Sequence, residues 1–311
     1  MTISSALCLF LGIPQSSIRL KSHTSGRITF QGADQSAFNI WTSGSVSFGN
    51  ESYGDQNARN KFSSSGLYAG VDTDLIRALK GGFVVGLSSS ATHVGLNGSK
   101  NDGRAATASA YASWHVLDHL FVDTLLGYGD ISFKLRRYDG NSAAFMSATR
   151  PGSMLFGSTA LSYDMRAGAL RYAPYVRLDF ISASLNAYEE QGAADWALVY
   201  SKLVVSSQGA VLGLRGQYDF AKDWGVLSLT GRAEVRHVLN GYATQRLTYQ
   251  VDPVSTSALQ ISGETRNGVT SGIGLKAAGG AGLSGLFEYS NTLTAMGLQS
   301  QGIRGMFNLA F

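Results

Sequence analysis

The sequence predicts an all-β protein: an antiparallel up-and-down transmembrane β-barrel of about 12 strands with a short N-terminal extension. Three observations lead to this prediction. From Phe38 onward, apolar residues alternate with polar or small ones in segments that Gly, Asp and Asn separate. Aromatic residues recur near segment ends, as at Trp41, Trp114, Trp224 and Tyr289, which is typical of the girdles of membrane barrels. Short turns also alternate with long connections along the chain.

Period-two alternation defines the expected strands, because successive side chains of a strand point to opposite faces. With ends defined to within about 2–4 residues, the strands are 38–49, 64–74, 82–96, 104–115, 119–133, 153–166, 170–188, 204–220, 225–238, 266–277, 282–292 and 302–311. Tilted strands of about 9–11 residues cross a bilayer. Short turns are expected at 167–168, 221–223 and 278–281, and longer connections at 50–63, 137–152, 189–203 and 239–265. This asymmetry is typical of membrane barrels.

One face of several strands is too polar for a protein core, where unpaired charges carry a large desolvation cost. We expect the charged residues of this face to line the lumen; they are Arg177, Asp179, Arg215, Arg232, Glu234, Arg236 and Glu288. Such charges can hydrate a pore and hold a polar segment that passes through it. Solvated lumen residues without a selective role are the alternative. A soluble β-sandwich would also alternate, but the aromatic segment ends favour the barrel.

Composition excludes several other classes. Only 15% of the residues are charged, yet the longest apolar run, 6–13, is far short of the roughly 20 residues of a spanning helix. The net charge of +4 is spread along the chain, so the basic stripe that nucleic acid requires is missing. The single cysteine, Cys8, has no Cys or His at metal-ligand spacing. We therefore predict no nucleic-acid partner, no cofactor and no metal.

Residues 1–37 form the expected N-terminal extension, and residues 38–311 form the barrel domain. The apolar stretch 3–13 resembles a signal peptide in length, but no Lys or Arg precedes it and no small-x-small cleavage site follows it. We interpret the extension as a mis-called start, or as the remnant of a linker or passenger in a longer secreted precursor.

Some stretches match the letters of catalytic motifs, but the structure expected around them does not fit those motifs. The stretch 280–285, GAGLSG, has the letters of a dinucleotide-binding loop, but a strand follows it where that motif needs a helix, so we predict a turn. No Ser lies in a Gly-x-Ser-x-Gly elbow. His115 and His119 flank an expected turn and not a helix face. Asp118 with His119 is the one candidate for a barrel hydrolase, and interfacial turn residues are the alternative. We predict no catalytic residues.

Several stretches, taken in order, resemble one family. They are 41–44 (WTSG), 70–72 (GVD), 121–129 (FVDTLLGYG), 174–179 (PYVRLD), 188–192 (YEEQG), 213–215 (GLR) and 234–237 (EVRH). Together they resemble the C-terminal translocator domain of autotransporters, the type V secretion proteins, over roughly residues 38–311. The resemblance implies a barrel in the outer membrane of a Gram-negative bacterium that anchors and helps export a covalently linked N-terminal passenger. It also implies a helical segment in the pore, whereas Arg27–Phe30 favours β structure.

The last segment places Ile303, Phe307, Leu309 and Phe311 on one face. These four resemble the signal by which the barrel assembly machinery recognises outer-membrane proteins. The implied partners are this machinery, outer-membrane lipid and a passenger, and the barrel is expected to be a monomer. A passive porin-like channel and an outer-membrane hydrolase remain the alternative functions.

Overall fold

A computed structural model describes residues 38–52, 59–240, 242–262, 267–280, 282–294 and 297–310. The predicted extension 1–37 and Phe311 of the predicted assembly signal lie outside the described residues. No helix in the described part of the chain is long and apolar enough to cross a membrane.

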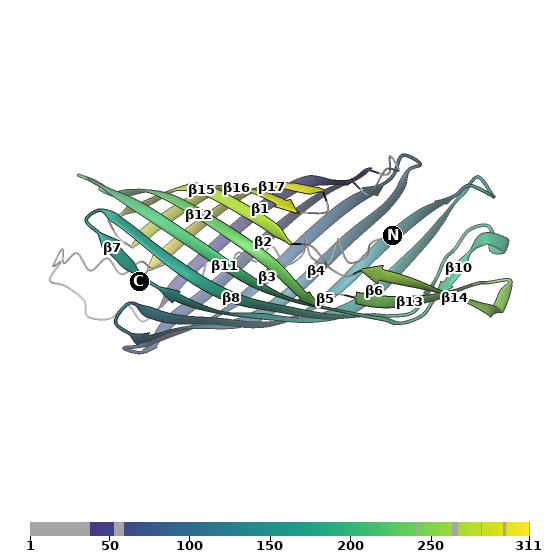
Figure 1. The fold of residues 1–311 in the computed structure, drawn as a ribbon, viewed down its shortest axis with the longest axis horizontal. Helices are drawn as coiled ribbons and strands as arrows, with labels where there is room; N and C mark the ends of the chain where they lie inside the picture. The colour runs from purple at the N-terminus through teal and green to yellow at the C-terminus, as the bar shows by residue number, and fades with distance from the viewer. Residues whose placement is uncertain are drawn as a thin grey trace.

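Long antiparallel strands form the wall of a closed barrel (Figure 1). They are β1 (Asn39–Ser52), β2 (Arg59–Ile76), β3 (Leu79–Val94), β4 (Ser99–Leu117), β5 (Leu120–Asp139), β6 (Ala144–Tyr163), β8 (Leu170–Leu185), β11 (Leu203–Lys222), β12 (Gly225–Asn240), β15 (Gly268–Gly279), β16 (Leu283–Thr294) and β17 (Leu298–Ala310). Each strand pairs with the next, β8 pairs with β11, and β17 pairs with β1. The predicted barrel of twelve strands is therefore confirmed.

The two ends of the barrel differ. Tight turns join β2 to β3, β4 to β5 and β11 to β12 at one end, and β7 (Met165–Ala167) turns into β8 there through Gly168, whose φ is +60°. The connections at the other end are longer. Figure 1 shows β10 (Leu198–Tyr200), β13 (Tyr242–Tyr249) and β14 (Asp252–Ser262) at this long-hairpin end.

Three predicted long connections prove to be largely structured. Strands β5 and β6 stay paired up to Asp139 and Ala144, within the predicted connection 137–152. The predicted connections 189–203 and 239–265 contain a second sheet in the order β14-β13-β10-β9, where β9 is Tyr188–Glu189, and a 3-10 turn, Ala194–Trp196. The alternation criterion failed here because strands beyond the lipid need no apolar outer face, while cross-strand hydrogen bonds keep them paired.

Side chains on the barrel wall segregate by parity, as the sequence predicts. Outward positions are apolar and exposed, as at Leu67, Phe83 and Phe307. Inward positions are mostly buried. Apolar side chains fill them toward the long-hairpin end, where Phe133 and Leu185 are fully enclosed and β13 packs against β11, and also toward the short-turn end, where Trp41, Tyr111 and Met306 are buried. The charged part of the inward face, on β8, β12, β16 and β17, is the candidate functional site.

Candidate functional site

Charged side chains enter the lumen because they occupy the positions between lipid-facing residues. On β8, Val176 and Leu178 are exposed on the outer face, whereas Arg177 and Asp179 lie on the inner face and are mostly covered. The same alternation on β12 places Glu234 inside and leaves Val235 outside. Charges need water or partners to be tolerated in such surroundings.

Glu234 is the centre of the charged wall. Its Oε1 lies 3.1 Å from Arg232 Nη1 and 3.4 Å from Arg177 Nη1. The hydroxyl of Tyr175 donates a short hydrogen bond to the same oxygen. One carboxylate thus serves three donors from two strands, β8 and β12, that are not neighbours in the sheet.

The network continues in both directions from this carboxylate. Asp179 lies 2.9 Å from Arg177 Nε and 3.3 Å from Arg236 Nη1. On the other side, Glu288 lies 3.1 Å from Arg232 Nη2 and 3.1 Å from Arg304 Nη2. Four arginines therefore meet three carboxylates, a difference of 4 − 3 = +1.

Glycines let these side chains reach across an intervening strand. Gly213 on β11 stands opposite both Tyr175 and Glu234, and a Cβ added at Gly213 would lie 2.2 Å from the Tyr175 ring. Gly272 on β15 stands opposite Arg232, and a Cβ there would lie 3.1 Å from the arginine side chain. A side chain at Gly213 would collide with the Tyr175 ring, and one at Gly272 would require Arg232 to shift slightly, so glycine leaves both paths open.

The structure joins six of the seven predicted lumen residues in this network and places Arg215 beside it. The Arg215 guanidinium lies 5.5 Å from the centre of the Tyr175 ring and donates to Ser162 Oγ over 3.3 Å. Sequence reasoning missed Arg304 and Tyr175 as members of the network. Arg304 could have been found from parity, because its neighbour Ile303 lies on the outer face of β17 and Arg304 must then face inward.

Among the side chains that the structure describes, the facing wall on β1 to β4 carries inward charges only near the short-turn end. Small hydroxyl residues lie on it among apolar and aromatic side chains such as Tyr68 and Val84; they include Ser43, Ser47, Ser64, Ser90 and Thr92. At the short-turn end Asp72 accepts hydrogen bonds from Asn39, Lys80 and Tyr111 at 3.0–3.2 Å. The lumen therefore has one wall of ion pairs and one of hydroxyl groups.

The described members of the predicted assembly signal face outward. Ile303, Phe307 and Leu309 are 40%, 64% and 37% exposed, and β17, which carries them, closes the barrel against β1.

The sequence motifs considered as signs of an enzyme lie at or next to turns. His119 takes a positive φ between β4 and β5, and the His115 ring stacks on Phe121 with ring centres 4.5 Å apart. In the stretch 280–285, residue 281 lies outside the described residues, and Gly282 leads with a positive φ into β16.

Removing lumen arginines should change ion selectivity. Replacing Arg215, Arg232 and Arg236 with Ser removes three positive charges from the lumen wall, so cations should be favoured over anions more strongly than in the parent barrel. Reversal potentials in planar bilayers under a KCl gradient measure this. A matched change of three outward-facing cations, Arg104, Lys134 and Arg136, to Ser should leave selectivity unchanged. Identical reversal potentials for both variants would mean that the lumen arginines do not line a conducting path.

The chain is similar to known autotransporter domains. The family model described as the autotransporter beta-domain matches residues 40–290. The fold is similar to the translocator domain of autotransporter NalP from Neisseria meningitidis, with a TM-score of 0.73, 15% identity and coverage of 90% of this chain and 91% of that one. It is also similar to the beta domain of the Bordetella autotransporter BrkA, with a TM-score of 0.64, 14% identity and coverage of 88% and 100%.

A third similar structure is the transport unit of the autotransporter AIDA-I from Escherichia coli, with a TM-score of 0.57, 12% identity and coverage of 99% and 98%. No curated protein sequence matches this chain. At these identities the solved structures establish the fold alone, whereas the family model covers most of the sequence. The chain belongs to the autotransporter beta-domain family.

Proposed function

We propose that this barrel is a non-enzymatic translocator of a Gram-negative outer membrane, which anchors an N-terminal, covalently linked passenger and helps to export it. One observation carries the proposal. Strand β1 begins at the short-turn end, where Asn39 stands opposite Asp72 and Ala310. A segment that precedes Phe38 therefore has to pass through the lumen to reach the long-hairpin end, if the short turns face the periplasm.

The chemistry of the lumen suits such a passage. The hydroxyl wall and the ion-pair wall offer donors and acceptors to a hydrated polypeptide along the inner face. The arginines are already paired with carboxylates, so the net charge of this wall is small. A passing segment therefore meets no strong electrostatic field of one sign. Family membership supports the same role.

Surface labelling tests the export role. An epitope tag placed before Phe38, behind a functional signal peptide, should be reached by antibody on intact cells. The same tag inserted at Asp223, in the short turn between β11 and β12, should be reached only after the outer membrane is permeabilised. A tag before Phe38 that stays hidden until permeabilisation would contradict export.

The C-terminus provides a test of the proposed partner, the barrel assembly machinery. Deleting Phe311 should reduce outer-membrane insertion of a signal-peptide fusion and leave degraded or periplasmic material. Leu309→Lys, near the short-turn end, should cost only about 0–1 kcal/mol in lipid contact if it lies at the interface. Cell fractionation compares the two variants with the parent. Equal outer-membrane yield for all three would contradict the recognition role, and a strong defect of Leu309→Lys would favour recognition over lipid contact.

A further inference from the structure

Basic side chains, three of them Lys or Arg, form a row across the outer face of four neighbouring strands near the long-hairpin end. In register, Lys61 on β2 stands opposite His93 on β3, His93 opposite Lys100 on β4, and Lys100 opposite Arg136 on β5. All four alternate with inward residues, as Lys61 does with the buried Phe62. We call these four residues the cationic row.

The cationic row has few partners of its own. Lys100 pairs with Asp102 at 2.6 Å, and the Arg136 guanidinium lies 3.7 Å from the centre of the Phe145 ring. Lys100 and Arg136 stand directly opposite each other, and like charges in this position destabilise a sheet. An external anion between them would relieve this repulsion.

Outward charge is concentrated on this side of the barrel. From the row of Leu67 and Leu87 to the long-hairpin end, the outward charges of β2 to β5 among the side chains that the structure describes are Lys61, Lys100, Arg104, Lys134 and Arg136 against Asp102 and Asp130, which gives 5 − 2 = +3 with His neutral. Asp130 stands in the row of the two leucines. Uncharged residues take the corresponding outward positions on other strands; they include Ser182, Gln208, Asn291, Gln301 and Asn50. The charge is therefore local to one face and not a general property of the rim.

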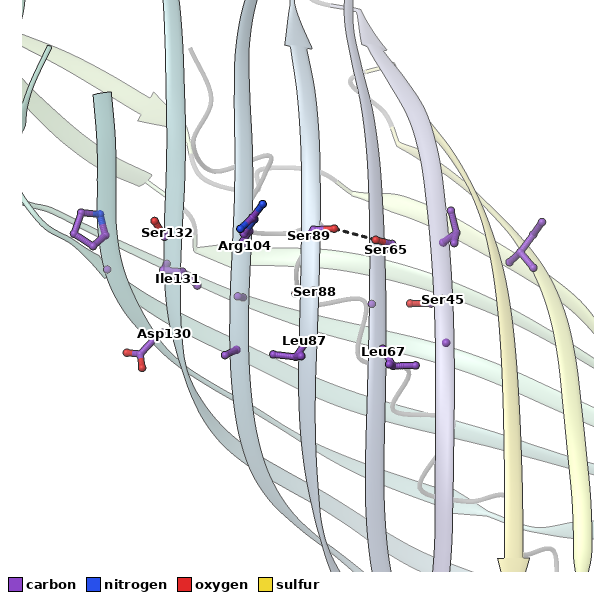
Figure 2. Close-up of a pocket in the computed structure, with 18 of the residues that line it drawn as sticks. Ser45, Ser65, Leu67, Leu87, Ser88, Ser89, Arg104, Asp130, Ile131 and Ser132 are labelled. Atoms are coloured by element: carbon purple, nitrogen blue, oxygen red, sulfur yellow. Dashed lines mark hydrogen bonds between the residues drawn. The ribbon is translucent and has the colours of Figure 1, made fainter. Parts of the chain in front are cut away.

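An apolar concavity lies on the same outward face, separated from the cationic row by one outward row that contains Asp102 and Lys134. It has a volume of about 960 Å³, and its lining includes Leu67, Leu87, Ser65, Ser89 and Arg104. Figure 2 shows the two leucines side by side on β2 and β3, with Ser65, Ser89 and Arg104 in the next row along the strands. Leu67 and Leu87 are 61% and 65% exposed, so this surface can receive acyl chains.

We propose that this face binds a phosphorylated glycolipid of the surrounding leaflet, with acyl chains on Leu67 and Leu87 and phosphates on the cationic row. Four strands at about 4.8 Å spacing extend the row over roughly 14 Å, enough for a headgroup with two phosphates. A lipid is favoured over a soluble anion because the apolar surface and the cationic row lie on one outward face, with the cations Arg104 and Lys134 in the two rows between them. The inference rests on the proposed placement in the outer membrane.

Lipid titration tests the site. The full chain, folded in zwitterionic detergent, is titrated with bis-phosphorylated lipid A, and bound lipid is counted by native mass spectrometry. Replacing Lys61, Lys100 and Arg136 with Gln should weaken binding about tenfold or more, since each cation near a membrane surface contributes about 1 kcal/mol. The matched control replaces three cations of the short-turn end, Arg77, Arg166 and Lys222, with Gln and should bind within about twofold of the parent.

Two outcomes would overturn the proposal. One is equal affinity of the two triple variants for the bis-phosphorylated lipid. The other is equal affinity of the parent chain for lipid A from which both phosphates have been removed, since the cationic row would then have no role. Because the titration uses folded protein in detergent, failure of passenger export in cells would not produce either result.

Discussion

Replacing Glu234 with Gln is expected to lower the free energy of unfolding of the barrel by about 2–4 kcal/mol. Removing one partner of a buried pair leaves an uncompensated charge and typically costs about 3–5 kcal/mol. Glu234 serves both Arg177 and Arg232, which the loss of its charge would leave with weaker partners. Water in the lumen screens part of this effect, which places the expected value at the lower end of the range.

Urea titration of the barrel in detergent, followed by tryptophan fluorescence, measures this change. Glu189→Gln is the matched control, because Glu189 is exposed on β9 and its loss should change stability by no more than about 0.5 kcal/mol. A second variant, Tyr175→Phe, keeps all charges and removes one hydrogen bond, so it should cost about 1 kcal/mol. Glu234→Gln and Glu189→Gln with the same midpoint would show that the network does not hold the barrel together.

Alternation was sufficient to predict the fold because the two faces of the barrel wall meet different environments. Lipid outside and water or packed polar groups inside force Val176 and Arg177 to opposite faces, and that contrast is visible in the sequence. The second sheet was missed for the same reason: β13 and β14 lie beyond the apolar band, so neither face has to be apolar.

The pairing within the lumen could not be predicted from parity. Parity assigns a face, but the partner of a residue depends on the register between strands, and a shift of one residue moves every side chain to the other face. Tyr175 meets Glu234 only because Gly213 stands between them in register. The glycine was visible in the sequence, but its position opposite two specific residues was not.

Arg150 is a buried structural residue that the sequence analysis placed in a loop. It falls within the connection predicted at 137–152, yet it lies on β6, points inward and is fully buried. Its guanidinium donates from Nε to the Asn186 carbonyl at 2.8 Å, from Nη1 to Gln245 Oε1 at 3.0 Å and from Nη2 to the Ser201 carbonyl at 2.9 Å. One side chain thus joins three segments of the long-hairpin end.

Two tyrosines complete this environment. The Arg150 guanidinium lies 5.0 Å from the centre of the Tyr188 ring, and Tyr188 stacks on Tyr200 with ring centres 4.5 Å apart. Burial raises the pKa of the Tyr188 hydroxyl, so the ring stays neutral at physiological pH and attracts the cation through its face. Arg150 is therefore a main polar anchor of the second sheet, beside Arg137 on β5, whose guanidinium pairs with Glu190 next to β9.

Replacing Arg150 with Met should loosen this sheet without unfolding the barrel. The change keeps the apolar stem but removes the Arg150 donor from the Asn186 carbonyl and from Gln245 Oε1, at a cost of about 1–3 kcal/mol for each one that stays buried, whereas the Ser201 carbonyl keeps Gln245 Nε2 as a donor. Trypsin should then cut the folded protein about tenfold or more faster at Lys202 and Arg246, which border the freed contacts, because each 1.4 kcal/mol of easier local opening gives about a factor of 10. Lys134→Met, an outward change on neighbouring β5, should leave the cleavage rate unchanged. If both variants are cut as slowly as the parent chain while Arg150→Met retains its heat-modifiable barrel, the second sheet must be held in place by something other than Arg150.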